Sequence, residues 1–382
     1  MSSLSGGGME RAMLNLAGLY ASKGMGVDLL VASEQGPLIN EIPHKVNLVS
    51  LKSQPNRYRL WLLKAAFLID FSLFRLIFFR KLPKAVKVIP SLIQYLKQET
   101  PDLILSTPTT ANLALVWSAR YANYQGRVVI REATTLSQEI RHNPSLFFRV
   151  IRKFVTVWYN KADAVICVSK GVKEDLRNNF QADEIRMHVV QNYIDEKQLR
   201  YKADSDESRD IIKKYGNFIL SAGRLEPEKN YDLLIRAFAN IAGKVSHNLV
   251  ILGEGSQRTH LEILAQELSL ADRVFLPGYF VNPYPFIKAC EVFALSSVYE
   301  GSPNVIREAL ILDKKIISSD CPSGVRELLD NGRFGVLVET DNENQYSDLL
   351  YALLNGQIAV EHPSGNKLGD STAKLYENIL GI

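Results

Sequence analysis

Short apolar runs rich in β-branched residues alternate with longer amphipathic stretches along most of the chain. In the first half these runs lie at 27–32, 102–106, 128–130 and 164–168. In the second half they lie at 218–222, 248–252, 274–276, 292–295 and 315–318. Near-continuous apolar runs such as VVI and FIL are typical of strands buried on both faces of a parallel sheet. The pattern therefore predicts an α/β protein with two doubly wound parallel sheets.

The polar stretch KADSDESRD separates these two sets of strands. We expect an N-terminal Rossmann-like domain over 1–195 and a C-terminal one over 210–362, with the boundary between about Tyr193 and Ile211, the interval that contains this stretch. Ligands of open α/β sheets bind beyond the carboxyl ends of the strands, so two such domains imply a cleft and place the chemistry in the loops that follow the strands.

Composition is that of a globular protein, with 46% hydrophobic and 23% charged residues in 382 positions. The cysteines Cys167, Cys290 and Cys321 are far apart and odd in number, which favours buried thiols in a reducing compartment. The N-terminus MSSLSGGGMER lacks the charged and apolar regions of a signal peptide. We therefore expect a cytoplasmic protein.

Charge is unevenly distributed between the two halves. Residues 1–190 hold 25 Lys and Arg against 14 Asp and Glu, a net +11, and the remainder is net −7. An anionic partner of the first half, a membrane surface or a phosphate-bearing substrate, would explain the excess. No RNA-binding signature, zinc finger or basic-aromatic repeat accompanies it, so nucleic acid is not expected.

The first candidate loop is SSLSGGG at 2–8, followed by a helix predicted from about Met9 to Lys23. Its glycines Gly7 and Gly8 would let a ligand approach the backbone, and the helix N-terminus favours an anion. A Gly-rich turn with no ligand is an equally good interpretation. A strand should precede this loop, but only Met1 does, so we expect the first strand to be missing.

Two loops of the second half follow strands and carry charge. GRLEPEKN contains Gly223, Arg224 and Lys229, whose cations suit a diphosphate, and GEGS contains Gly253 and Glu254 near a base or ribose. For GRLEPEKN considered alone, a solvated loop is the better explanation, and GEGS alone is a weak signal.

The segment EGSPNVIRE follows the run at 292–295. We expect Ser302 to cap a helix in which Pro303 is the first residue. Glu300 and Glu308 could each accept hydrogen bonds from vicinal sugar hydroxyls. The alternative is an ordinary helix start with a surface glutamate.

The order of these segments resembles that of a known family. GRLEPEKN, GEGS, GYFVNPYPF, Glu-x7-Glu and ISSDCPSGVRELL follow one another as in the retaining glycosyltransferases of family 4, whose fold is GT-B. SLSGGGMERAMLNLA, ADAVICVSKGV and VVQNYID also resemble members, so the resemblance covers essentially the whole chain. It implies two Rossmann-like domains and a C-terminal helix, over 363–382, that crosses back to the first.

The resemblance also implies roles for individual residues. Arg224 and Lys229 would hold the donor diphosphate and stabilise the charge on the leaving nucleotide. Glu308 would accept the ribose hydroxyls, and Glu300 would bind the transferred sugar near its 3-hydroxyl. The remaining donor-side positions would be the backbone of Gly223 and Gly253, Glu254, the segment Gly301, Ser302, Pro303 and Asn304, and the glycines Gly7 and Gly8 of the other domain.

Members of this family need no metal, and no DxD-type pair is present, so we expect neither a metal nor another cofactor. The expected reaction retains anomeric configuration by same-face attack, with a donor phosphate oxygen assisting deprotonation of the acceptor.

One departure from the family concerns the loop after 128–130. Many relatives carry a histidine there, but this sequence reads RVVIREATTLS. Arg131, Glu132 or Thr134 could line the acceptor side instead. His142 lies further along, and we interpret it as a surface or loop histidine.

Residues 57–97 hold nine Lys and Arg against the single acid Asp70, and no 18-residue stretch is free of charge. Arg57, Lys64 and Arg75 fall on one side of a helical wheel, and Pro90 should kink the helix that follows. A basic amphipathic segment of this kind suits the inner surface of an anionic membrane. The alternative is that its apolar face is domain core.

Together these features predict a metal-independent glycosyltransferase that moves a hexose or N-acetylhexosamine from a UDP-sugar, or from a GDP-mannose-type donor. The acceptor would be a glycan or a polyprenyl-diphosphate-linked saccharide in bacterial surface polysaccharide assembly. A GT-B epimerase acting on UDP-N-acetylglucosamine and a non-catalytic sugar-nucleotide-binding protein remain as alternatives.

Overall fold

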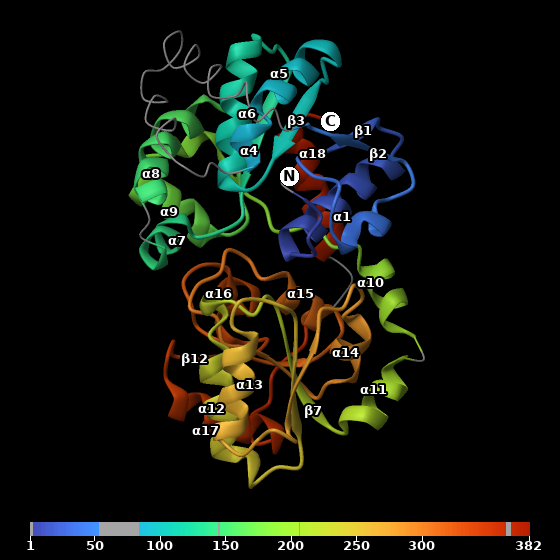
Figure 1. Cartoon of the computed structure of the whole chain (residues 1–382), viewed down its shortest axis with the longest axis vertical. Helices are drawn as coiled ribbons and strands as arrows, with labels where there is room; N and C mark the ends of the chain where they lie inside the picture. Colours follow the sequence, from blue (N-terminus) through green and yellow to red (C-terminus); the bar gives the residue numbers. More distant parts are fainter. Residues whose placement is uncertain (1–2, 53–83, 144–145, 206, 364–367) are drawn as a thin grey trace. The chain divides into compact units, whose positions relative to one another are not determined.

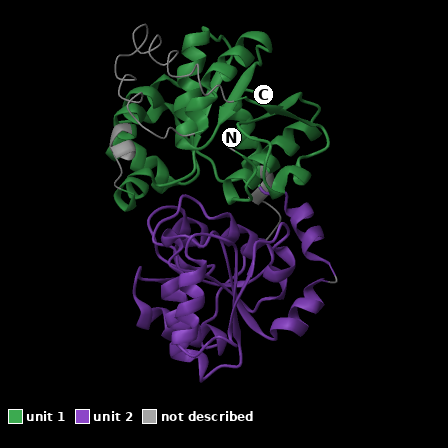
Figure 2. Ribbon diagram, in the orientation of Figure 1, with its two compact units in different colours: residues 1–193, 370–382 green, residues 194–369 purple. Residues whose placement is uncertain are grey.

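The structure is a computed structural model that describes residues 3–52, 84–143, 146–205, 207–363 and 368–382. The chain divides into two compact units (Figure 2). Unit 1 contains residues 1–193 and 370–382, and unit 2 contains residues 194–369. Each unit is built on parallel strands connected by helices (Figure 1).

Unit 2 has one six-stranded parallel sheet in the order β12-β11-β10-β7-β8-β9. The sheet therefore grows outward in both directions from the pair β7 and β10, as in doubly wound nucleotide-binding folds. Its strands are β7 Phe218–Ala222, β8 Asn248–Leu252, β9 Val274–Gly278, β10 Val292–Leu295, β11 Lys315–Ser319 and β12 Val336–Val338. Strands β7 and β10 are buried throughout, which explains their unbroken apolar runs.

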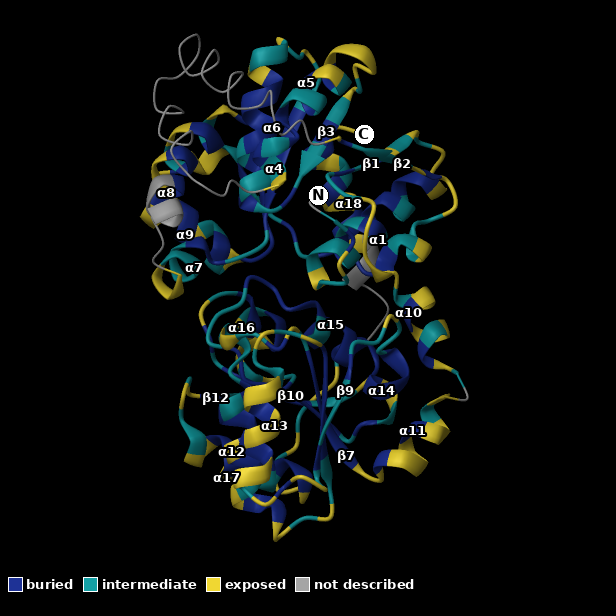
Figure 3. Cartoon of the chain, in the orientation of Figure 1, coloured by how far each residue is buried: buried dark blue, intermediate teal, exposed yellow. Residues whose placement is uncertain are grey.

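Helices cover the sheet of unit 2 on both faces; the outer sides of those at 231–242 and 258–267 are exposed, whereas the one at 304–311 has no exposed residue (Figure 3). They are α10 Glu196–Ala203, α11 Glu207–Tyr215, α12 Tyr231–Ala242, α13 Arg258–Glu267, α14 Tyr284–Ala289, α15 Asn304–Ile311, α16 Gly324–Leu328 and α17 Glu343–Leu354, with short 3-10 turns η5 Pro227–Lys229 and η6 Asp330–Gly332. The stretch KADSDESRD connects α10 to α11, so the predicted linker lies inside unit 2 and both helices pack on α14.

Unit 1 contains two separate parallel sheets among the described residues. The first pairs β1 Val27–Val31 with β2 Val46–Ser50, and the second has the order β3-β4-β5-β6. The strands of the second are β3 Leu103–Ser106, β4 Arg127–Glu132, β5 Ala164–Cys167 and β6 Met187–Val189. Residues 3–7 form no strand, and the Leu4 N–H donates to the Gln35 carbonyl at 3.0 Å.

The helices of unit 1 are α1 Gly8–Ser22, α4 Lys84–Lys87, α5 Ile89–Gln98, α6 Thr109–Ala122, α7 Leu136–His142, α8 Leu146–Trp158, α9 Lys170–Phe180 and α18 Leu368–Leu380, with 3-10 turns η1 Pro37–Glu41, η3 Tyr159–Lys161 and η4 Glu184–Arg186. Helix α1 packs Leu16 and Tyr20 against one face of the β3–β6 sheet, and α18 packs Tyr376 and Ile379 there. Lys23 pairs with Glu377, which adds an ionic contact between these two helices. The chain therefore returns to unit 1 after completing unit 2.

The described part of the basic segment, residues 84–97, belongs to α4 and α5. Helix α5 begins beside Pro90, which is its second residue, so the proline marks a break between two helices. Its residues Ile89, Leu92, Ile93 and Leu96 are buried against α6, so this apolar face is domain core. Arg57, Lys64 and Arg75 lie outside the described residues. Among the described helices, none is long and apolar enough to cross a membrane.

Candidate functional site

The candidate site of unit 2 lies where β7 and β10 are neighbours in the sheet. The chain leaves these strands toward opposite sides of the sheet, and in open α/β sheets ligands bind beyond the carboxyl edge at such a switch point. The loop after β7 carries Arg224 and Lys229, and the loop after β10 carries Glu300. The two loops are joined by backbone and side-chain bonds: the Val298 N–H donates to the Glu228 carbonyl at 2.9 Å, and the Ser296 hydroxyl to the Lys229 carbonyl at 2.8 Å.

Lys229 and Glu300 meet at this edge. The Lys229 Nζ lies 2.5 Å from the Glu300 Oε1, which also accepts from the Ser297 hydroxyl at 2.7 Å. The side chains are only 18% and 12% exposed, so their attraction is screened less than that of a surface pair. Motif order gave these two residues separate roles in one donor site, and the structure shows that they are in direct contact, which holds a cation in place at the switch point.

Arg224 occupies a different environment. Its guanidinium donates to the Glu228 Oε1 at 2.7 Å, and its side chain is 67% exposed. An exposed ion pair between residues four apart contributes little stability, so the Arg224 guanidinium can turn toward a ligand at a small cost in free energy. Arg224 is thus accessible at the same loop that holds Lys229.

Two glycines allow the neighbouring loops to approach closely. Gly253 has φ +141°, and a Cβ there would lie 1.9 Å from the Gly223 carbonyl oxygen. The Gly223 N–H also donates to the Leu252 carbonyl at 3.0 Å, so the loops after β7 and β8 are in contact. Glu254 is committed to Arg258, with a shortest contact of 2.6 Å. The glycines here shape the backbone, whichever ligand is bound.

The segment after β10 differs in one respect from the prediction. The N-cap of α15 is Pro303, with φ −69° and ψ 113°, and it makes no side-chain cap bond; the helix begins at Asn304. Ser302 is therefore not the cap, because the extended backbone of Pro303 delays the helix by one residue. Gly301, Ser302, Pro303 and Asn304 are buried, and so is Glu308, which is 5% exposed in the second turn of α15.

A second loop holds this segment. The Gly301 carbonyl accepts from the Gly324 N–H and from the Ser323 hydroxyl, both at 3.0 Å. A Cβ at Gly324 would lie 2.5 Å from the same carbonyl oxygen, so only glycine fits. The segment SSDCPSG thus fixes the backbone beside Glu300, and Cys321, whose thiol pKa is raised by burial, lies close enough to feel the charges of Glu300 and Lys229.

In unit 1 the predicted glycines begin helix α1. Gly7 is its N-cap, with no side-chain cap bond, and Gly8 is its first residue and exposed. The first-turn N–H groups of a helix without a capping side chain can bind a ligand's anionic group.

The three residues predicted on the acceptor side lie at the end of β4 or just after it. Arg131 is 1% exposed, and its guanidinium donates to the Thr107 hydroxyl at 3.4 Å and to the Asn192 side chain. Glu132 is fully buried, and burial raises the pKa of its carboxyl. Thr134 is half-buried in the loop after β4. His142 ends α7 and is exposed, with its ring Nδ1 2.9 Å from the Gln138 carbonyl.

Sequence reasoning missed the partners of these buried charges. The Tyr159 hydroxyl donates to the Glu132 Oε2 at 2.6 Å, and the Thr109 hydroxyl donates to the same oxygen at 3.0 Å. Asn112 donates to the Arg131 carbonyl at 3.0 Å and lies 3.2 Å from the Tyr159 hydroxyl. These residues come from separate segments, and no sequence motif linked them to β4.

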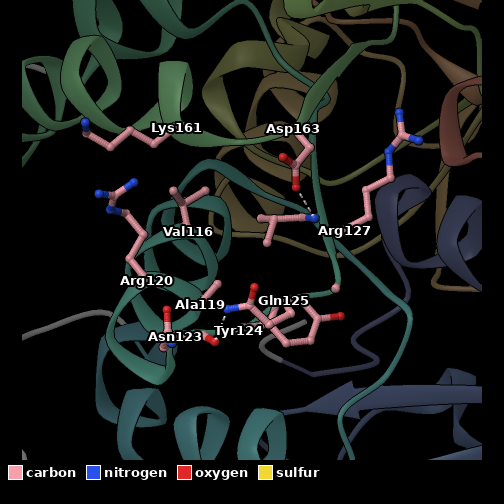
Figure 4. A pocket seen from close by; sticks show the side chains of 11 residues that line it. Val116, Ala119, Arg120, Asn123, Tyr124, Gln125, Arg127, Lys161 and Asp163 are labelled. Carbon is pink, nitrogen blue, oxygen red and sulfur yellow. Dashed lines mark hydrogen bonds between the residues drawn. The ribbon is translucent and has the colours of Figure 1, made fainter.

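A cavity of about 720 Å³ lies at the opposite, amino edge of the same sheet (Figure 4). Arg120, Lys161 and Asp163 lie around it, and the Asp163 carboxylate accepts from the Val128 N–H at 2.7 Å. Arg120 lies in the last turn of α6 and Lys161 ends η3, where cations complement the negative end of the helix dipole. Its charges therefore have a structural explanation, and we do not assign the chemistry to it.

Among the residues that the structure describes, no three His, Cys, Asp or Glu side chains are grouped as metal ligands would be.

Comparison with known families shows which protein family the chain belongs to. The sequence model described as Glycosyltransferase Family 4 matches residues 6–198, and the one described as Glycosyl transferases group 1 matches residues 204–370. The chain belongs to glycosyltransferase family 4. This confirms the family, and the activity class, that the order of motifs predicted.

Curated relatives of this glycosyltransferase include bacterial enzymes of glycan synthesis. It is 38% identical over 277 residues to N-acetylgalactosamine-N,N'-diacetylbacillosaminyl-diphospho-undecaprenol 4-alpha-N-acetylgalactosaminyltransferase of Campylobacter jejuni, covering 72% of each chain. It is 25% identical to a lipopolysaccharide 1,6-galactosyltransferase of Salmonella typhimurium, covering 79% of this chain and 78% of that one.

Solved structures agree on the fold of the glycosyltransferase. Anabaena HepE in complex with UDP-glucose superposes with a TM-score of 0.73 at 18% identity, covering 100% of this chain and 92% of that one. The glycosyltransferase WaaG superposes with a TM-score of 0.68 at 13% identity, covering 100% and 94%. The predicted GT-B fold is thereby confirmed.

Proposed function

We propose that this glycosyltransferase transfers a hexose or N-acetylhexosamine, with retention of configuration, from a UDP-sugar to a glycan or polyprenyl-diphosphate-linked acceptor. The observation that carries the proposal is the contact between Lys229 and Glu300 at the switch point of unit 2. A cation held beside a carboxylate suits a donor in which a charged diphosphate adjoins a sugar with free hydroxyls. The relatives' donors and acceptors, as named above, are of this chemical kind.

In the proposed mechanism, Lys229 and Arg224 bind the donor diphosphate. As the bond between the anomeric carbon and the phosphate oxygen breaks, negative charge grows on the leaving UDP, and these cations stabilise it. Lys229 is already fixed by Glu300, so little reorganisation is needed at that point. Arg224 is 67% exposed, and it turns from Glu228 to the phosphate.

Glu300 and Glu308 bind the two ends of the donor. Lys229 and Ser297 hold the Glu300 carboxylate at the carboxyl edge of the sheet, and we assign to this carboxylate the hydroxyls of the transferred sugar. Glu308, in the second turn of α15, accepts the ribose hydroxyls. A donor phosphate oxygen takes the proton of the attacking acceptor hydroxyl, so attack and departure occur on one face of the sugar.

The acceptor and the location of the enzyme follow from the N-terminal charge. The net +11 of residues 1–190 suits an anionic membrane surface that carries a lipid-linked acceptor. We therefore propose that the enzyme is peripheral on the cytoplasmic face. Liposome flotation tests this: changing Arg57, Lys64 and Arg75 to Glu should abolish binding to anionic vesicles, and unchanged binding would contradict the proposed surface.

The deciding experiment is nucleotide release from a panel of UDP- and GDP-sugars, with and without lipid-diphosphate and soluble glycan acceptors. Acceptor-dependent release of UDP with transfer of the sugar is the expected result. Conversion of the donor to an isomerised sugar nucleotide without acceptor would identify an epimerase. Binding of UDP-sugars without any turnover would instead indicate a non-catalytic binding protein.

A further inference from the structure

Glu132 is a buried carboxylate at the carboxyl end of β4, and no cation bonds to it among the described residues. Burying a carboxylate is costly unless hydrogen bonds replace its lost water, and burial accordingly raises the pKa of this group. A site that tolerates this cost needs the carboxylate for something that an apolar side chain could not do.

The donors around Glu132 come from three separate segments. Tyr159 of η3 and Thr109 of α6 both donate hydroxyl hydrogen bonds to Oε2, at 2.6 and 3.0 Å. The Ala133 N–H donates to Oε1 at 3.0 Å, and the Thr134 N–H is also directed at the carboxylate. One side chain therefore fixes two consecutive amides of the loop that follows β4.

The other end of that loop is also held. The Ser137 N–H donates to the Asp175 Oδ2 at 3.0 Å, so α7 is tied to α9. Only residues 133–136 lie between Glu132 and Ser137, the two residues at which the loop is held. Among these four residues, Thr134 has the half-exposed polar side chain. The loop is thus preset before any ligand arrives, which is the condition for precise alignment of a reacting group.

We infer that Glu132 is a positioning residue that acts through the loop at 133–135 and sets Thr134 for contact with the acceptor. The inference rests on the proposed function, because it assumes that the loop after β4 faces the acceptor. Glu132 itself is fully buried, with both oxygens occupied, so it does not touch the substrate. The hydroxyls of Tyr159 and Thr109, which donate to its Oε2, keep the Glu132 carboxylate in its orientation.

The test compares Tyr159→Phe and Glu132→Gln with a matched control. Tyr124→Phe is the control, since its hydroxyl also bonds within unit 1, to the Pro101 carbonyl, but at the far edge of the sheet. We expect both network variants to lower kcat about tenfold and to raise the acceptor KM. The donor KM and the slow hydrolysis of donor without acceptor should change less than twofold, as should every constant of the control.

Glu132→Gln separates positioning from direct catalysis. A glutamine keeps an oxygen for the Ala133 N–H and can donate its amide to the two hydroxyls, so a positioning role is only weakened. If this variant lost both transfer and donor hydrolysis by more than a thousandfold while remaining folded, Glu132 would be acting on the reaction directly and the inference would be wrong.

Coupling provides the sharper readout. If Glu132 works through Thr134, combining Thr134→Ala with Tyr159→Phe should cost no more than Thr134→Ala alone, whereas independent roles would multiply the losses. Hydrogen exchange of the Ala133 and Thr134 amides should be faster in Tyr159→Phe and in Glu132→Gln than in Tyr124→Phe. Equal exchange in all three variants would overturn the inference, whether or not a substrate is known.

The two proposals fail differently. No turnover of any nucleotide sugar by the wild-type protein would overturn the proposed function, while the exchange experiment would still decide whether Glu132 holds the loop. The positioning role alone would be overturned if the wild-type protein turns over a donor but two results differ from expectation. These are an unchanged acceptor KM in Tyr159→Phe and Glu132→Gln, and losses that multiply when Thr134→Ala is combined with Tyr159→Phe.

Discussion

The exit of β10 in unit 2 and the exit of β4 in unit 1 each place charged residues at the carboxyl edge of a parallel sheet. After β10, Glu300 is partly exposed and meets Lys229 from the neighbouring loop. At β4, Arg131 and Glu132 are buried, and their bonds go to protein groups on their own unit. The same position in the fold therefore holds charge in two ways, as a partly exposed ion pair after β10 and as a buried hydrogen-bonded network at β4.

The difference arises from what packs above each strand. The Glu300 side chain, which contacts Ser297 and Lys229, is still 12% exposed. By contrast, Tyr159 and Thr109 enclose Glu132 within the core formed by α6 and α8. A charge at a strand end is thus a ligand contact only where the neighbouring helices leave it uncovered.

The largest effect should come from Lys229→Ala. Loss of the cation at the diphosphate removes stabilisation of the leaving group, and UDP release should fall on the order of 10³-fold. The thermal midpoint should also fall, because the alanine leaves the mostly buried Glu300 without its cation, so turnover is measured below the midpoint of the variant. Lys229→Arg serves as the charge-retaining control, and near-normal turnover of the alanine variant would refute the assignment of this edge.

Glu300→Gln should lower turnover by about 10²-fold. The amide keeps a hydrogen-bond acceptor for Ser297 but loses the charge that fixes Lys229, so both kcat and the donor KM should worsen. Initial rates over a range of donor concentrations measure the two constants. A variant that changed only the acceptor KM would place Glu300 on the wrong substrate.

Arg131→Ala and Arg224→Ala compare a buried arginine with an exposed one. Arg131→Ala leaves Asn192 and Thr107 without their donor in a closed core, and the free energy of unfolding should fall by about 3 kcal/mol. Arg224→Ala should alter it by no more than about 0.5 kcal/mol but raise the donor KM. Urea unfolding and donor kinetics of both variants check this. Equal stability losses would remove the distinction drawn between the two regions.

The smallest effect is a pH dependence carried by Glu132. Burial raises the pKa of this carboxyl in the folded protein above the usual 4.5. At a pH between 4.5 and the raised pKa, the folded protein keeps a proton that the unfolded chain has lost. This group therefore makes wild-type stability decline as the pH rises through that interval. In Glu132→Gln the contribution is absent, so the stability difference between variant and wild type should shift in favour of the variant with rising pH. A difference independent of pH would contradict the raised pKa.

Much of the architecture was predictable from the sequence, because buried parallel strands need unbroken apolar runs. The bounds of β7, β8 and β10 agree with the apolar runs at 218–222, 248–252 and 292–295. The start of α15 could not be predicted, because Ser302 is a common N-cap residue and proline is common at the first helical position, which places the start one residue too early. The extended backbone of Pro303 moved the helix by one residue.

The sequence by itself determined the family, the two sets of strands and the loops that follow them, since these depend on periodicity and on motif order. Only the tertiary structure decided which charges meet. Lys229 and Glu300 are 71 residues apart, and their contact exists because β7 and β10 are neighbours in the sheet. Arg131 and Glu132 were two of the three candidates for the acceptor side, and alternation along β4 sends their side chains to different partners in the core. Whether a charged residue faces a ligand or the interior depends on the packing of distant helices, which no local pattern records.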